Sequence, residues 1–178
     1  MTTKAALVAL CLPGMAQAVT CRDDIFEDAS YSVCEVAPGE DLRLFLNGPN
    51  GSYGGFAAVD AELARNGETL AFAMNAGMYH RDRSPVGLYI EGGEEKHAIV
   101  TAEGPGNFGL LPNGVFCWAD GSFNISDSRQ FEPLRGNCRY ATQSGPMLVI
   151  NGKLHPRFLA DSDSFKIRNG VGVDSKGH

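Results

Sequence analysis

Hydrophobic residues along this chain occur mainly in short runs, and the runs are typical of β-strands. Apolar residues occupy every second position of residues 42–46, which is the period of a strand with one buried face. Further runs of this kind cover residues 31–36, 70–75, 86–91 and 97–101. Gly92 and Gly93 separate the last two runs, so this part of the sequence predicts a hairpin.

Two other hairpins are predicted by short turn sequences between apolar runs. Asp120-Gly121 lies between residues 115–118 and residues 122–125, where Trp118 and Phe116 are expected in the core. Asn151-Gly152 lies in the same way between residues 147–150 and residues 153–155. Consecutive hairpins favour an antiparallel sheet.

One helix is expected after Gly54-Gly55. Phe56, Val59 and Leu63 follow the helical period and share one face, and Asn66-Gly67 provides a C-terminal stop. A helix among hairpins predicts an α+β fold, with largely antiparallel or mixed sheet.

The end of the chain carries one more strand signal. Residues 171–174 read as a strand, and Ser175-Lys176-Gly177 reads as a turn just before the last residue, His178. A strand without its hairpin partner leaves an exposed edge, which natural proteins avoid. We therefore expect the sequence to be the front part of a longer domain.

The first eighteen residues have the pattern of a signal peptide. Lys4 precedes the apolar residues 5–12, Pro13-Gly14 follows, and Ala16-Gln17-Ala18 has the small residues that a signal peptidase recognises. The apolar run is far shorter than the ~20 residues of a membrane-spanning helix. A buried N-terminal helix is the alternative. The favoured interpretation is an exported protein, periplasmic or secreted, whose mature part is one domain of residues 19–178.

Composition excludes two classes of partner. The chain has 178 residues, 15 Lys+Arg and 21 Asp+Glu, which gives a net charge of −6. No basic run is available to follow a phosphate backbone, so nucleic acid is not an expected partner, and binding to an anionic membrane surface is disfavoured. Hydrophobic residues make up 43% and charged residues 20%, as in a folded globular protein.

Four cysteines remain in the mature part, and they allow three disulfide pairings. We expect Cys21–Cys34 and Cys117–Cys138, because each pair is close in sequence and spans a turn-rich segment. No Cys-x2-Cys pair is present, so a zinc site is disfavoured. The sequence predicts no metal and no cofactor.

Four short motifs occur in order along the chain. They are Asn75-Ala76-Gly77-Met78-Tyr79, Pro85-Val86-Gly87, Ser144-Gly145-Pro146-Met147-Leu148 with Asn151-Gly152-Lys153 after it, and Arg168-Asn169-Gly170-Val171-Gly172. Together they resemble the phosphodiester glycosidase family, over about residues 31–177. Ala76 and Asn169 differ from the usual Gly and Thr of that family, and its acidic Gly-rich motif lies further downstream than this chain reaches.

The resemblance implies an exported hydrolase that cleaves a sugar from a small-molecule or glycan phosphodiester. Arg168 is expected to pair with the phosphate through its planar guanidinium. Asn75 and Gly77 are expected at the sugar, where small residues let a ligand approach the backbone. Ser144, Gly145 and Asn169 complete the predicted substrate-binding set.

The catalytic carboxylate is open between two candidates. Asp82 lies in the polar segment 80–84, which is also typical of a solvated loop. Asp163 lies with Asp161 just before Arg168, where capping roles or calcium binding are alternatives. His80 and His155 are the candidate histidine bases, and a structural role is expected for His155. The alternative function is a non-catalytic exported module that binds phosphorylated glycans, or an inactive fragment.

Overall fold

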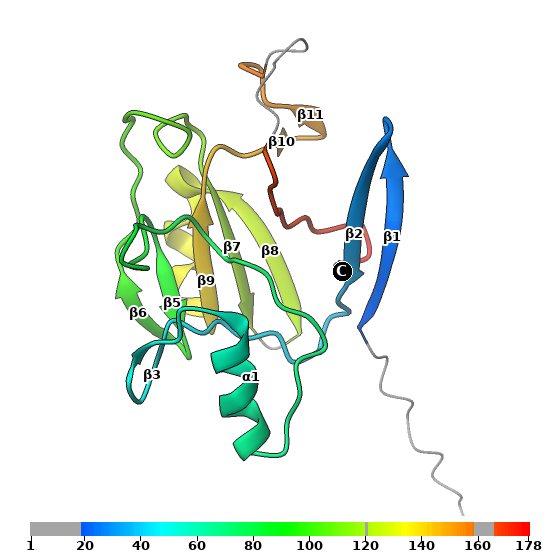
Figure 1. Cartoon of the computed structure of the whole chain (residues 1–178). Coiled ribbons are helices and arrows are strands. Elements are labelled where there is room, and N and C mark those ends of the chain that lie inside the picture. Colours follow the sequence, from blue (N-terminus) through cyan, green and yellow to red (C-terminus); the bar gives the residue numbers. More distant parts are fainter. Residues whose placement is uncertain (1–18, 120, 159–165) are drawn as a thin grey trace, which may run out of the picture.

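The computed structural model describes residues 19–119, 121–158 and 166–178 (Figure 1). Its elements in chain order are β1 (Thr20–Phe26), β2 (Ala29–Glu35), β3 (Asn47–Gly48), β4 (Gly51–Ser52), α1 (Phe56–Arg65), β5 (Tyr89–Glu91), β6 (Glu94–His97), β7 (Gly114–Ala119), β8 (Ser122–Asp127), the 3-10 helices η1 (Ser128–Gln130) and η2 (Glu132–Asn137), β9 (Tyr140–Ser144), β10 (Val149–Ile150) and β11 (Lys153–Leu154). One α-helix with mostly antiparallel strands in several sheets confirms the α+β prediction.

A five-stranded sheet forms the centre of the molecule, in the order β6-β5-β9-β7-β8. Every neighbouring pair in it is antiparallel. β7 and β8 form the hairpin that the sequence predicts at residues 115–125, and β5 and β6 form the one predicted around Gly92-Gly93. β9 occupies the middle of the sheet and pairs with β5 on one side and β7 on the other.

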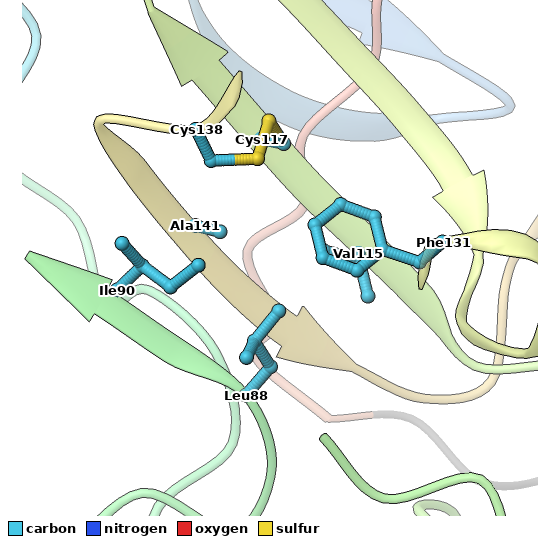
Figure 2. Packing of buried hydrophobic residues seen from close by; sticks show 7 residues of the cluster. All are labelled: Leu88, Ile90, Val115, Cys117, Phe131, Cys138 and Ala141. Atoms are coloured by element: carbon cyan, nitrogen blue, oxygen red, sulfur yellow. A yellow bond between two sulfur atoms is a disulfide. The ribbon is translucent and has the colours of Figure 1, made fainter. Parts of the chain in front are cut away.

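One face of the sheet packs against η1 and η2. The buried residues of this cluster are Leu88, Ile90, Val115, Cys117, Phe131, Cys138 and Ala141 (Figure 2). The disulfide Cys117–Cys138 joins β7 to the residue that follows η2. Both of its cysteines belong to this core, so the crosslink fixes the cover of the sheet directly to a central strand.

The other face packs against the extended segment 42–46. Leu44, Tyr89 and Trp118 are buried there, and Leu42 and Leu46 pack on them. Trp118 Nε1 donates a hydrogen bond of 2.8 Å to the carbonyl oxygen of Leu42. The prediction of a strand at residues 42–46 is therefore wrong, although the alternating burial behind it is real. The segment is held by side-chain packing and by the hydrogen bond from Trp118, and not by a strand ladder.

Helix α1 begins and ends where the sequence predicts. Gly55 is its N-cap, and Asn66 is its C-cap, with Gly67 at a φ of +74° after it. Val59 and Leu63 are buried, whereas Phe56 is 47% exposed. Of the three residues predicted to share the apolar face, only Val59 and Leu63 are buried.

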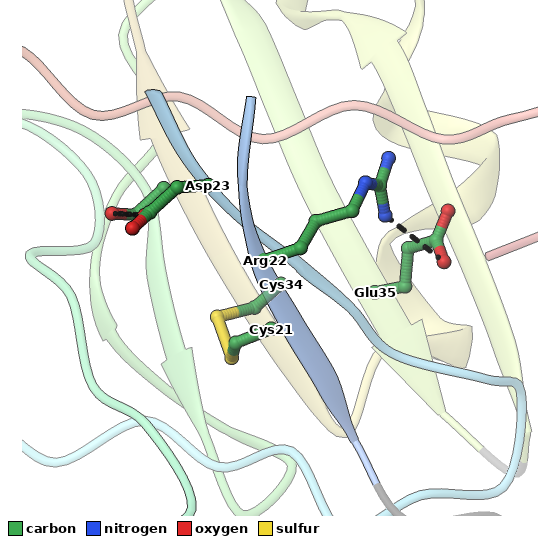
Figure 3. The surroundings of a disulfide bond; sticks show 6 residues. Cys21, Arg22, Asp23, Cys34 and Glu35 are labelled. Atoms are coloured by element: carbon green, nitrogen blue, oxygen red, sulfur yellow. Dashed lines mark hydrogen bonds and ion pairs between the residues drawn. A yellow bond between two sulfur atoms is a disulfide. The ribbon is translucent and has the colours of Figure 1, made fainter. Parts of the chain in front are cut away.

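The N-terminal hairpin β1–β2 stands apart from the central sheet in Figure 1. Cys21 and Cys34 lie opposite each other in its register and form the predicted disulfide. Arg22 pairs with Glu35 across the two strands at 3.3 Å (Figure 3). Every residue of β1 is exposed. The hairpin is therefore held by its own ladder, one crosslink and surface ion pairs.

Four other strand predictions differ from the structure. Residues 70–75 and 171–174 form no strand, although the predicted turn after the second run is real, with Gly177 N donating to Asp174 O at 3.1 Å. The run 86–91 is a strand only at Tyr89–Glu91. The return strand predicted at residues 97–101 lies instead at Glu94–His97. This strand starts directly after the two glycines and carries three charged residues, as edge strands often do.

The predicted hairpin around Asn151-Gly152 is formed by β10 and β11, with Asn151 and Gly152 both at positive φ. The predicted signal peptide, residues 1–18, lies outside the described residues. Within the described ranges, no helix has both the length and the apolar character to cross a membrane.

Candidate functional site

The first motif, residues 75–79, lies against the central strand β9. Gly77 N donates a hydrogen bond of 2.8 Å to Thr142 Oγ1, and Met78 N donates one of 3.3 Å to Gln143 O. Thr142 and Gln143 are 8% and 1% exposed. The motif is therefore attached to a rigid, buried part of the sheet.

The glycine of this motif is required by that contact. A Cβ at Gly77 would lie 2.2 Å from Thr142 Oγ1 and 2.4 Å from Gln143 O, far inside van der Waals distance. The sequence suggested that small residues here let a ligand approach the backbone. In the structure, the group that approaches Gly77 most closely is β9 itself.

The third motif continues from the end of β9. Ser144 is exposed, and because side chains alternate along a strand it lies on the same face as Thr142. The Gly145–Pro146 peptide bond is cis, and Met147 N donates to Pro112 O at 2.9 Å. Motifs one and three therefore meet at this end of β9.

Gly145 is also closely packed, and a side chain there would require Asn113 to shift. A Cβ there would lie 2.0 Å from Asn113 Oδ1. Asn113 is fully buried, and among the described residues neither its amide nitrogen nor its amide oxygen has a partner. Unpaired buried amides are rare, because each unpaired polar group costs about 1–3 kcal/mol.

The fourth motif reaches the first one across 94 residues of sequence. Asn169 Nδ2 donates a hydrogen bond to Asn75 O, so two predicted substrate-binding residues are in direct contact. Arg168 is exposed next to this contact in sequence, and its Nη1 donates to Lys166 O at 3.4 Å. The structure thus brings Asn75, Gly77 and Asn169 together with the strand that carries Ser144.

Gln143 is a residue that the sequence reasoning missed. Its Oε1 accepts hydrogen bonds from Leu88 N at 2.9 Å and Val100 N at 3.1 Å, and its Nε2 donates to Val100 O at 2.6 Å. The Gln143 side chain therefore makes the two hydrogen bonds to the backbone of Val100 that a neighbouring strand would otherwise make. A glutamine in a strand gives no sequence signal for such a role.

Gln143 also explains the glycine of the second motif. A Cβ at Gly87 would lie 2.4 Å from Gln143 Oε1. Val86, next to it, donates from its N to Met78 O at 2.9 Å, which connects motif two to motif one. Motifs one and two therefore pack on Thr142 and Gln143, and motif three continues the chain directly after these two residues.

Asp82, one of the two predicted catalytic carboxylates, caps its own loop. Its Oδ1 accepts from Ser84 Oγ at 2.6 Å and from Ser84 N at 3.0 Å. These bonds hold the pKa of the exposed Asp82 carboxyl below its usual range. Asp82 is thus an ionised loop carboxylate, and its catalytic role stays a prediction. Asp163, with Asp161, lies outside the described residues.

His155 has the structural role that the sequence favoured. The ring is buried, its Nδ1 accepts from Arg157 N at 3.2 Å, and its Nε2 lies 3.2 Å from Leu111 O. Since Nδ1 accepts a hydrogen bond, the ring hydrogen lies on Nε2, which donates to the carbonyl oxygen of Leu111. Both nitrogens of the imidazole are therefore engaged with the backbone.

Among the described residues, two concave regions are candidate ligand sites. The larger, of about 550 Å³, lies near Trp118 and Tyr140, at the other end of β9 from Ser144. The smaller, of about 360 Å³, is lined by several residues of the segment 103–111 and by Arg157. No motif residue lines the second region, but its loop adjoins the third motif, because Asn107 O lies 3.3 Å from where a Cβ of Gly145 would be. Nowhere in the described ranges do three or more His, Cys, Asp or Glu side chains gather as metal ligands.

Comparisons with known proteins agree with the motifs. The family model described as Phosphodiester glycosidase matches residues 68–178. The chain is similar to the uncharacterized protein YigE of Escherichia coli (strain K12), with 38% identity over 140 residues. That alignment covers 78% of this chain and 54% of YigE, so the chain spans about half the length of this relative. No solved structure matches the chain significantly.

Proposed function

Because the chain belongs to the phosphodiester glycosidase family, we propose that it hydrolyses the bond between a sugar and a phosphodiester. The observation that carries this proposal is the convergence of family motifs on one end of β9. Asn169 contacts Asn75, and Gly77 contacts Thr142, although the first pair is 94 residues apart in sequence.

In the proposed reaction, a carboxylate takes a proton from water, and the oxygen of that water forms a bond to the anomeric carbon of the sugar. The bond between that carbon and the phosphate oxygen breaks, and the electron pair leaves with the phosphate monoester. A phosphate monoester is a good leaving group, so this reaction needs less proton donation than an ordinary glycoside. It needs a cation for the phosphate and hydrogen-bonding groups for the sugar.

The proposal assigns these roles to exposed motif residues. Arg168 pairs with the phosphate, since a guanidinium can bind two phosphate oxygens at once. Asn75, Asn169 and Ser144 hold hydroxyl groups of the sugar. Asp82 and Asp163 remain the proposed carboxylates.

A coupled assay tests the reaction and shows on which side of phosphorus the diester is cleaved. The substrate is a sugar 1-phosphodiester of 4-nitrophenol. Cleavage at the anomeric carbon releases 4-nitrophenyl phosphate, which becomes coloured only after added alkaline phosphatase. Cleavage on the other side of phosphorus releases 4-nitrophenol without phosphatase. Colour that requires phosphatase supports the proposal, and colour without it indicates a phosphodiesterase.

Substitution of Arg168 tests its role. A charge-assisted hydrogen bond contributes about 1.5–3 kcal/mol, so Arg168→Lys should lower kcat/KM roughly ten- to a hundred-fold. Arg168→Ala should lower it further while the thermal unfolding transition is kept. Wild-type turnover in Arg168→Ala would contradict the assignment. Loss of the unfolding transition would show instead that Arg168 is needed for the fold.

We also propose that the protein is exported, to the periplasm or beyond the cell. Its two disulfides support this location, because such bonds persist in oxidising compartments. N-terminal sequencing of exported protein should begin at Val19. Retention of Met1 in that material would contradict the signal peptide.

The alternative function is glycan binding without turnover. It is favoured by the capping geometry of Asp82, which leaves that carboxylate engaged with Ser84. Binding of the substrate in the micromolar range, with no product over many hours, would support this alternative.

A further inference from the structure

A groove of about 360 Å³ lies beside the third motif. Its lining residues are Glu103, Gly104, Gly106, Gly109, Leu110, Leu111 and Arg157. Asn107, in the same loop, has its carbonyl oxygen 3.3 Å from where a Cβ of Gly145 would lie. Pro112, just after the loop, accepts the hydrogen bond from Met147 N. The groove wall therefore touches the segment that follows Ser144.

Arg157 supplies the positive charge of this groove. Its backbone N bonds to His155 Nδ1, and the buried His155 ring bonds in turn to Leu111 O in the groove wall. The base of the arginine is thus fixed to the wall that it faces. Within the described part of the chain, its guanidinium makes no hydrogen bond and no ion pair.

The glycine loop gives the groove a wall made of backbone. Gly104 N donates to Gly109 O at 3.4 Å, and a Cβ at Gly109 would lie 1.8 Å from Gly104 O, so the loop closes tightly on itself. Gly106 has a φ of +70°, which favours glycine. A ligand can approach this backbone without meeting side chains, and Leu110 and Leu111 add an apolar surface.

Glu103 is the carboxylate in the lining. It makes no ion pair with Arg157, and it acts at longer range on Arg129, whose pKa is raised first by Asp127 and to a smaller extent by Glu103. The groove thus offers a guanidinium that has no partner among the described residues, and a separate carboxylate. This combination suits a ligand with an anionic group and hydroxyl groups.

We propose that this groove binds the phosphate monoester that leaves the reaction, which rests on the proposed function above. Arg157 pairs with the phosphate oxygens, and Glu103 accepts hydrogen bonds from hydroxyl groups on the carbon chain of the monoester. The phosphate carries one negative charge in the diester and close to two in the free monoester at pH 7. A second cation on the leaving-group side therefore binds the product more strongly than the substrate.

Titration with glycerol 3-phosphate, followed by NMR, tests the proposal without any need for turnover. We expect shifts at the amides of Gly104, Gly106 and Gly109 and at Arg157 Nε, and none with glycerol. Arg157→Gln should weaken the affinity roughly ten- to a hundred-fold, the range for loss of a charge-assisted hydrogen bond. Arg65→Gln is the matched control, because Arg65 pairs with Glu62 on α1 and does not line the groove. The affinity of the Arg65→Gln protein for glycerol 3-phosphate should stay at the wild-type value.

Glu103→Gln gives a test of the opposite sign. Loss of a carboxylate in the lining should increase the affinity for inorganic phosphate about two- to fivefold, since like charges near the ligand are removed. Absence of binding to the wild-type chain, shifts that leave out both the glycine loop and Arg157, or equal affinity in Arg157→Gln would overturn the proposal. Binding in the groove combined with no cleavage of the diester would support the groove and contradict the proposed function instead.

Discussion

The two disulfides of this chain lie in opposite surroundings. Cys117 and Cys138 are 7% and 6% exposed and belong to the core beneath the central sheet. Cys21 and Cys34 crosslink a hairpin whose first strand is exposed throughout. The chemical bond is the same in both places, so differences in its effect report on what surrounds it.

The comparison separates global from local stability. The two bonds close similar stretches of chain, with sequence separations of 21 and 13 residues. Loop entropy alone assigns each of them roughly 3 kcal/mol. Only the Cys117–Cys138 bond, however, connects two residues of the main core. The Cys21–Cys34 bond restrains an exposed hairpin, which we expect to open while the sheet stays folded.

Removal of the buried disulfide should have the largest effect. Cys117→Ala with Cys138→Ala should lower the free energy of unfolding by about 3 kcal/mol or more, since a buried crosslink and its packing are lost together. Cys21→Ala with Cys34→Ala should leave the global value nearly unchanged and increase amide exchange only in β1 and β2. Urea unfolding and hydrogen exchange measure the two effects. Equal global losses in both double variants would show that the hairpin unfolds with the sheet.

The next prediction concerns the close approach of motif one to β9. Gly77→Ala should cost about 1–3 kcal/mol, because the new methyl group would overlap backbone and side-chain oxygens of β9. Gly172→Ala is the matched control, since nothing lies within 4 Å of a Cβ at that position. Urea unfolding of the two variants gives the comparison. A Gly77→Ala protein as stable as Gly172→Ala would mean that the motif is not attached as described.

A smaller effect is expected from the hydrogen bond that holds this motif. Thr142→Val removes the acceptor of the Gly77 N–H with little change of shape, and it should cost about 1 kcal/mol. Amide exchange at Gly77 should become faster. Thr142→Ser keeps the hydroxyl and should restore slow exchange. Unchanged exchange in Thr142→Val would contradict a role for this bond.

Local sequence signals predicted the elements that depend on local residues. Turn and capping residues predicted the hairpins around Gly92-Gly93 and Asn151-Gly152 and the ends of α1. Both disulfides were predicted because the paired cysteines are close in sequence. The α+β fold could be predicted for the same reason. These features require no knowledge of distant contacts.

Other features depend on contacts between distant residues, and the sequence alone did not reveal them. Residues 42–46 alternate like a strand, but Trp118 and the core of one sheet face hold them without a ladder. The Gln143 side chain replaces a strand beside Val100, and the Arg157 groove forms only when residues 103–111 meet the chain after β11. For the site, the motifs predicted which residues converge. They did not predict that Gly77 and Gly145 are glycines because of β9 and Asn113.

The smallest effect is expected for a substitution in the exposed N-terminal hairpin. Ile25 lies in β1 with 80% of its surface exposed, whereas Ile90 lies in the sheet core with 3% exposed. Ile25→Thr should therefore change the free energy of unfolding by less than about 0.5 kcal/mol, as surface substitutions do. Ile90→Thr is the same chemical change in a buried position and should cost more than about 1 kcal/mol, because a packed methyl group is lost and a hydroxyl is buried. Urea unfolding at pH 7 measures both values. A loss in Ile25→Thr as large as in Ile90→Thr would show that the hairpin packs against another surface in solution, and the contrast between the two regions would then be wrong.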